Sequence, residues 1–153
     1  MSRFVIGNNS IKRASVYDPL PNGCRLIPLP LKGDERGRLV AIEADGDAPF
    51  AIARVYYVYA TSPGTVRGLH AHRALDQFTV AVAGACTMLL DDGRRRVEVR
   101  LDDPATGLTL PPMVWHEMSN FSPDCVLMVL ASAPFDEADY IRDYSEFMTL
   151  ATA

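Results

Sequence analysis

Alternation of apolar and polar residues runs through most of this chain and predicts β-strands. Residues 94–101, RRRVEVRL, alternate charged and apolar side chains as a half-exposed strand does. Residues 77–92, QFTVAVAGACTMLLDD, form a long apolar run broken at Gly84, which indicates two strands around a turn. Turn sequences such as DDG at 91–93 and DDPATG at 102–107 recur about every eight to twelve residues. We therefore predict an all-β fold of about ten short strands.

The period of the pattern changes only near the end of the chain. Residues 136–150, DEADYIRDYSEFMTL, place side chains at helical spacing, at Ala138, Ile141, Tyr144, Ser145 and Met148. Asp136 or Asp139 is available near the start of this segment to cap a helix. The pattern predicts one short C-terminal helix.

The first residues lack any sustained period. Residues 1–23 are polar and rich in turn signals, so we expect an N-terminal arm or a strand lent to a partner. Residues 24–153 are expected to form a single domain, because this length is enough to bury a core. The run CRLIPLPL at 24–31 contains Pro28 and Pro30, which suits an edge strand because proline cannot donate to a strand ladder.

Composition and charge narrow the class of protein. The chain is 48% hydrophobic and 22% charged, which is typical of a globular domain. Its net charge of -4 gives no electrostatic reason to expect nucleic acid or an anionic membrane as a partner. No apolar run is long enough for a signal peptide or a membrane span, so we predict a cytoplasmic protein. Cys24, Cys86 and Cys125 are odd in number and widely spaced, which favours core positions over disulfides or a zinc site.

The segment 67–77, RGLHAHRALDQ, holds the candidate chemistry. His70 and His72 are two of the three histidines, and alternate residues of a strand point the same way, about 7 Å apart. Imidazole titrates near neutral pH and can take or give a proton. The segment therefore presents two imidazoles to one cavity.

Two motifs in the chain resemble those of the cupin superfamily. The first, a glycine followed by H-x-H, is matched at Gly64, His70, His72, Gln77 and Gly84, with Gln77 in place of the family's glutamate. The second is matched at Pro111, Met113, His116 and Asn120, with Met113 in place of a glycine. The resemblance implies a cupin fold, a jelly-roll β-barrel, followed here by the short C-terminal helix.

The resemblance extends to one group of cupins. The chain is similar to the sugar-nucleotide 3,4-ketoisomerases over the range from Cys24 to Met148. Three stretches carry this similarity: RVYYVYATSPGTVRGLHAHRALDQ, PPMVWHEMSNFSPDCVLMVLAS and FDEADYIRDYSEF. It implies an isomerase that moves the keto group of dTDP-4-keto-6-deoxy-D-glucose from C4 to C3, supplying a later aminotransferase. It also implies a homodimer with exchanged N-terminal strands. The edge-like run at 24–31 agrees, because it would leave an unpaired ladder in a monomer.

The metal site typical of cupins is incomplete in this sequence. His70, His72 and His116 match the three histidine ligands, but Gln77 is a neutral and weaker ligand than the usual carboxylate. Asp76 would point to the opposite face of the strand. We predict no metal and no other cofactor.

The ketoisomerase chemistry needs a base at C3 and a proton donor at C4. We favour His72 as the base and His70 as the group that shuttles a proton between the oxygens. Tyr57 and Tyr59 are candidates to donate to the developing enolate oxygen or to stack on the base. In a strand over 54–59 they share a face with Val55, whereas Arg54, Tyr56 and Val58 share the other.

Substrate binding needs cations for a diphosphate. The candidates are Arg67, Arg73, Arg54 and Arg38, of which Arg67 precedes a glycine that lets the backbone approach closely. Arg38 is also a candidate for deciding which face of C4 is protonated. His116 is either a wall of the cavity or a donor to the sugar.

Three other functions stay open. A 3,5-epimerase of the same nucleotide sugar would use related base chemistry and would exchange the proton at C5 without moving the carbonyl. A metal-dependent cupin dioxygenase would carry iron. A non-catalytic sugar-binding cupin is disfavoured by the H-x-H pair.

Overall fold

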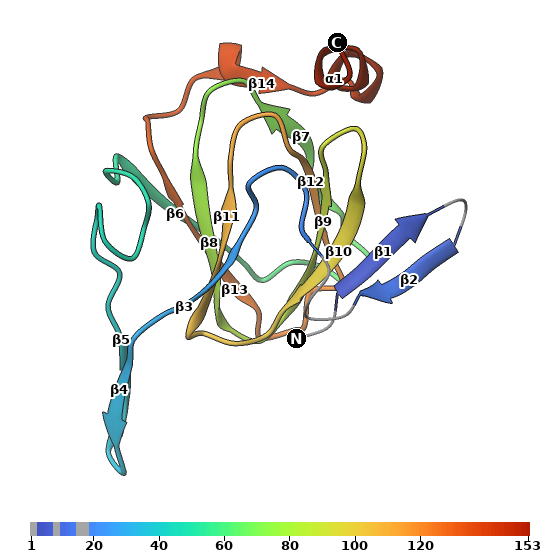
Figure 1. The fold of residues 1–153 in the computed structure, drawn as a ribbon. Coiled ribbons are helices and arrows are strands. Elements are labelled where there is room, and N and C mark those ends of the chain that lie inside the picture. The colour runs from blue at the N-terminus through green and yellow to red at the C-terminus, as the bar shows by residue number, and fades with distance from the viewer. Residues whose placement is uncertain (1–2, 8–9, 15–18) are drawn as a thin grey trace.

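The computed structural model describes residues 3–7, 10–14 and 19–153, and most of its strands belong to two antiparallel sheets (Figure 1). The first sheet has the order β14 (Tyr140–Ile141), β7 (Arg67–His72), β12 (Trp115–Ser119), β9 (Cys86–Asp91), β10 (Arg96–Leu101), β1 (Arg3–Gly7) and β2 (Ser10–Ala14). The second has the order β3 (Leu26–Pro28), β11 (Thr106–Leu110), β8 (Gln77–Ala83), β13 (Val126–Ala131) and β6 (Arg54–Tyr59). A separate hairpin of β4 (Leu31–Asp34) and β5 (Gly37–Val40) extends away from them (Figure 1).

The core lies between the two large sheets. Val97, Val99 and Leu101 of β10 are buried, whereas the charged residues that alternate with them are half-buried. These side chains join a cluster that includes Leu108 of β11 and Leu127 of β13, from the other sheet. The strand pattern therefore arises because each strand buries one face between the sheets.

The predicted all-β class is confirmed, and so are the edge strand and the turns. β3 lies at an edge of its sheet and ends at Pro28. Gly84 separates β8 from β9, and Gly93 lies in the turn between β9 and β10 with a φ of 88°. Among the described residues, strand pairing forms separate sheets and does not close them into one barrel.

The C-terminal prediction is only partly correct. The α-helix, α1 (Tyr144–Ala151), begins later than expected and is capped by Asp143, whose side chain accepts a bond from the Glu146 N–H. Before it come a short 3-10 helix, η1 (Glu137–Asp139), capped by Asp136, and the two-residue strand β14. Neither Asp136 nor Asp139 caps α1, because the backbone between them and α1 is extended and pairs with β7.

The remaining predictions concern the arm, the cysteines and the membrane. The backbone of 3–7 and 10–14 forms a hairpin on β10, and the boundary at residue 23 stays a prediction. All three cysteines are buried and free, and burial raises the pKa of Cys24 and Cys86 to about 12, as expected for core thiols. No helix in the described part of the chain is long and apolar enough to cross a membrane.

Candidate active site

The three histidines come together at one end of the space between the sheets. β7 and β12 are neighbours, and His70 lies opposite His116 in their register. The ring centroids are 4.9 Å apart for His70 and His72, 4.6 Å for His70 and His116, and 6.0 Å for His72 and His116. The predicted pair on β7 is therefore confirmed as a pair, and the fold adds the third ring.

Each histidine uses its Nδ1 for a bond to the protein. His70 Nδ1 lies 2.9 Å from the Gly68 carbonyl oxygen, and His116 Nδ1 lies 3.1 Å from that of Val114. His72 Nδ1 lies 3.0 Å from Asp139 Oδ2. Because carbonyl and carboxylate oxygens only accept, Nδ1 carries the proton in each ring, and each Nε2 is left with a lone pair.

Asp139 fixes His72 from the C-terminal segment. Its second oxygen, Oδ1, accepts a bond of 2.8 Å from the Ala74 N–H, so the carboxylate is held from two sides. His72 Nε2 is buried and has no hydrogen-bond partner. The arrangement is a carboxylate–imidazole pair with an unsatisfied acceptor pointing away from the carboxylate. The sequence analysis missed it, because it assigned Asp139 to a helix cap.

Burial keeps the three imidazoles neutral at pH 7. Desolvation lowers the pKa of His72 to about 4 and that of His116 to about 3, and it also lowers the pKa of His70. The short contact with Asp139 raises the pKa of His72, but burial and the neighbouring His70 outweigh it. The site therefore supplies bases rather than preformed imidazolium acids.

Two cavities reach the histidines. One of about 160 Å³ is lined by His72, Asp139, Tyr140 and Arg54 among others. The other, of about 310 Å³, is lined by His70, Arg67 and Arg142, and also by Tyr140 and Arg54. Tyr140 lies between them, with its ring centroid 4.8 Å from that of His70 and 4.5 Å from that of His72. The sequence analysis missed Tyr140, because it placed this residue in a helix.

The predicted tyrosines do not meet the histidines. Tyr57 and Tyr59 are 63% and 65% exposed, on the outer face of β6. Tyr56 points inward instead, and its hydroxyl accepts a bond of 2.9 Å from Gln77 Nε2. The alternation of β6 separates the two sets of side chains as predicted, with Tyr56 on the inward face. A role for Tyr57 or Tyr59 in the reaction stays a prediction.

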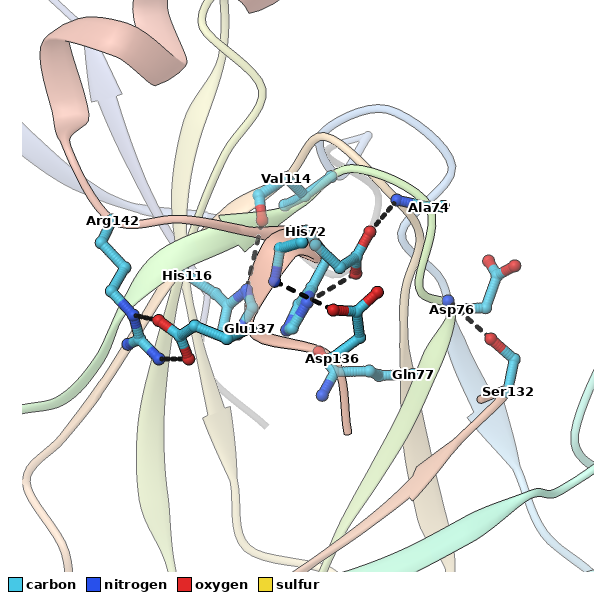
Figure 2. A network of polar contacts seen from close by, with 12 residues as sticks. His72, Ala74, Asp76, Gln77, Val114, His116, Ser132, Asp136, Glu137 and Arg142 are labelled. Atoms are coloured by element: carbon cyan, nitrogen blue, oxygen red, sulfur yellow. Dashed lines mark hydrogen bonds and ion pairs between the residues drawn. The ribbon is translucent and has the colours of Figure 1, made fainter. Parts of the chain in front are cut away.

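The predicted arginines divide into two groups. Arg54 and Arg67 line the cavities at the histidines. Arg73 is paired with Glu146 of α1, 2.7 Å away, and Arg38 lies in the separate β4–β5 hairpin. Arg142, which the sequence analysis did not consider, lines the larger cavity, lies 4.2 Å from the centre of the Tyr140 ring and pairs with Glu137 (Figure 2).

The three histidines also have the spacing of metal ligands. One ligand atom from each lies within 4.8 Å of the others, and neutral imidazoles suit ions such as zinc. Gln77 and His116 line one small cavity, so the amide lies where the cupin pattern expects a carboxylate. The donor set fits three ligands of such an ion and lacks the negative charge of the fourth.

Comparison with known proteins relates this arrangement to one family. The family model FdtA (WxcM-like, C-terminal) matches residues 22–152. A TDP-4-oxo-6-deoxy-alpha-D-glucose-3,4-oxoisomerase from Aneurinibacillus thermoaerophilus is 54% identical over 114 residues, which are 74% of this chain and 82% of that protein.

Solved structures of 3,4-ketoisomerases are also similar to this chain. The 3,4-ketoisomerase QdtA from Thermoanaerobacterium thermosaccharolyticum, in complex with TDP, is 37% identical with a TM-score of 0.85, covering 87% of this chain and 97% of that one. A mutant of QdtA with a histidine replaced by asparagine, in complex with TDP-4-keto-6-deoxyglucose, has a TM-score of 0.83 at 37% identity, covering 84% of this chain and 94% of that one.

Proposed function

The chain belongs to the FdtA family and is a TDP-sugar 3,4-ketoisomerase, and from this premise we propose that its histidines carry the keto group of TDP-4-keto-6-deoxyglucose from C4 to C3. The observation that carries the mechanism is the bare Nε2 of His72, which is held by Asp139 and faces a cavity. A neutral imidazole with a free lone pair is the form that a base requires.

The first step is removal of the proton on C3. His72 Nε2 takes this proton, the electron pair of the C3–H bond forms a C3=C4 double bond, and the π pair of the C4 carbonyl moves onto O4. Asp139 stabilises the imidazolium that results, because its carboxylate lies 3.0 Å from Nδ1. The low pKa of free His72 rises at this moment, since an enolate now lies beside it.

The second step moves the proton from O3 to O4 and returns one to carbon. The His70 ring lies 4.9 Å from that of His72 and has its own Nε2 lone pair, so it takes the O3 proton and delivers it to O4. An electron pair of O3 then forms the C3 carbonyl, and the π pair of the C3=C4 bond takes a proton from His72 at C4. No atoms are gained or lost, as an isomerisation requires.

Binding of the diphosphate falls to the cations at the larger cavity. Arg67 is exposed at its edge, and Arg142 lies on the other side of Tyr140. A guanidinium matches phosphate oxygens with two parallel bonds. Arg142 is already paired with Glu137, so it would have to exchange that partner for the phosphate.

We also propose the homodimer with exchanged N-terminal strands, in which the exchanged element is the β4–β5 hairpin, because β1 pairs with β10 of its own chain. Every residue from Leu31 to Leu39 is exposed, including Leu31 at 53% and Leu39 at 57%. A two-stranded hairpin is marginally stable in water by itself, so a second copy of the chain is the partner that would cover it. Arg38 would then serve the partner's site rather than its own.

Mixed dimers test this arrangement. Arg38→Met and His72→Asn subunits, each inactive alone, should regain up to about a quarter of the wild-type activity when they are unfolded and refolded together, because only the heterodimer contains one intact site. A monomer in light scattering would contradict the dimer. A dimer without regained activity would show that Arg38 serves its own chain.

The mechanism is tested in deuterated buffer. The His72 imidazolium must exchange its proton with solvent before it returns one to C4 for deuterium to enter the product. With that exchange, we expect wild-type protein and TDP-4-keto-6-deoxyglucose to give a 3-keto sugar with deuterium at C4, which NMR detects. His72→Asn should abolish both exchange at C3 and product formation, whereas His70→Asn should retain exchange at C3 and lose carbonyl transfer. Retention of C3 exchange in His72→Asn would refute His72 as the base. Deuterium at C5 would identify the epimerase, and loss of activity with a chelator would identify a metal enzyme.

A further inference from the structure

Two buried polar atoms without partners line the same cavity. Among the described residues, Arg54 Nε and His72 Nε2 are both buried and have no hydrogen-bond partner. Both side chains line the cavity of about 160 Å³. Arg54 Nε can only donate, and the neutral His72 Nε2 can only accept. Buried polar atoms are usually satisfied, so this pair is an unfilled site that needs one acceptor and one donor side by side.

The fold holds the Arg54 guanidinium in place without neutralising it. Arg54 lies on the inward face of β6, and the centre of its guanidinium is 5.2 Å from the Tyr56 ring centroid and 5.8 Å from that of Phe135. Among the described residues it has no carboxylate within ion-pair distance, whereas Arg73 and Arg142 each have one. The aromatic faces restrain the cation and leave its charge free for a ligand.

The positive charge acts on His72. Arg54 is among the groups that lower the pKa of the His72 imidazole, which places the two side chains within electrostatic reach of each other. The same charge would lower the energy of an anion formed beside His72.

We propose that Arg54 is a catalytic residue that donates to O4 of the keto sugar and stabilises the negative charge formed there. This inference rests on the proposed role of His72 as the base. When His72 Nε2 takes the C3 proton, the carbonyl π pair moves onto O4, and the Arg54 N–H is the donor that receives this oxyanion. The C4 carbonyl oxygen supplies the acceptor that Arg54 Nε needs, and the neighbouring C3–H supplies the acidic proton that His72 Nε2 removes.

This role differs from binding the diphosphate. Arg54 borders the smaller cavity with His72, whereas Arg67 and Arg142 border only the larger one. A diphosphate ligand would affect substrate binding, while a donor to O4 acts chiefly in the transition state. Loss of a diphosphate ligand therefore raises KM, whereas loss of a donor to O4 lowers kcat.

The experiment compares Arg54→Met with Arg67→Met in the full-length protein. For Arg54→Met we expect kcat and the rate of C3 exchange in deuterated buffer to fall about 10²- to 10³-fold, as for loss of an oxyanion donor, with the Kd for TDP changed less than threefold. For Arg67→Met we expect the opposite, a higher KM and a weaker Kd for TDP with kcat largely kept. Guanidine added to Arg54→Met should restore part of the exchange rate.

A pH profile and a second variant, Arg54→Lys, also test the role of Arg54. The acid limb of the kcat/KM profile should move to higher pH in Arg54→Met, because a cation beside His72 is gone. Arg54→Lys keeps the charge and should fall between wild type and Arg54→Met, which tests the inference even where Arg54→Met fails to fold. A weakened TDP Kd with kcat kept in the Arg54 variants would overturn the inference. C3 exchange surviving in His72→Asn would instead overturn the proposed base.

Discussion

Replacement of Asp139 by asparagine tests the carboxylate–imidazole pair most directly. Asp139 accepts two bonds, from His72 Nδ1 at 3.0 Å and from the Ala74 N–H at 2.8 Å. Asparagine has the same shape but one oxygen and one NH2 group. Only one of the two donors can therefore keep its acceptor.

The two orientations of the asparagine have different consequences. If its oxygen faces His72, the NH2 group opposes the Ala74 N–H, which leaves two donors facing each other at a cost of about 1–3 kcal/mol. If its oxygen faces Ala74, the NH2 group donates to His72 Nδ1 and moves the proton to Nε2, which removes the base. The active orientation is the costly one, so we expect kcat to fall about 5- to 150-fold at about 1.4 kcal/mol per tenfold.

Initial rates of 3-keto product formation at saturating substrate measure this effect. Asp136→Asn is the matched control, because Asp136 lines the same cavity and, among the described residues, its side chain forms a hydrogen bond with the Ala138 N–H and none with a histidine. We expect kcat of Asp136→Asn to stay within threefold of wild type. A kcat within threefold of wild type for Asp139→Asn would refute the pair as a determinant of catalysis.

Three further predictions follow from burial and backbone conformation. The pKa values of His72 and His116 are lowered in the folded state, so the unfolded chain binds more protons than the folded chain between pH 6.5 and about 4. The free energy of unfolding, measured in urea, should therefore fall by a few kcal/mol as the pH is lowered across that range. Stability unchanged between pH 7.5 and 5 would contradict this. Gly68→Ala should lower both stability and kcat, because Gly68 has a φ of 82° and a Cβ there would lie 2.9 Å from the His116 carbonyl oxygen. A melting temperature equal to that of wild type would contradict the predicted loss of stability. Tyr140→Ala should reduce kcat/KM at least tenfold, on the order of the 1.4 kcal/mol expected for lost aromatic contacts, whereas Tyr57→Ala should change it less than threefold. Equal effects would contradict the placement of these rings.

The histidine strand and the class of fold could be predicted from the sequence because both depend on local alternation. In RVEVRL every second side chain is apolar, and the structure buries the three apolar ones. In RGLHAHR the same period put the His70 and His72 rings beside each other, although they line two cavities rather than the one expected. Family motifs added His116, which no local pattern connects to the pair.

Only tertiary packing decided which face of a strand meets the site. Alternation in β6 separates Tyr56 from Tyr57 and Tyr59, but both faces carry aromatic side chains, so the sequence does not say which one turns inward. The structure turns Arg54 and Tyr56 inward because that face of the second sheet packs over the first. Packing therefore brings the predicted Arg54 to the cavities at the histidines and leaves Tyr57 exposed.

The C-terminal segment shows the same limit at longer range. Spacings of three and four residues from Ala138 to Met148 predicted one helix, but the backbone at 140–141 gives up helical bonds to pair with β7. Ile141 is fully buried there beside Trp115 and Phe147, and this packing outweighs the local preference for helix. The sequence by itself determined the strands and the histidine pair, whereas long-range pairing decided that Asp139 and Tyr140 lie against that pair, 67 or more residues away along the chain.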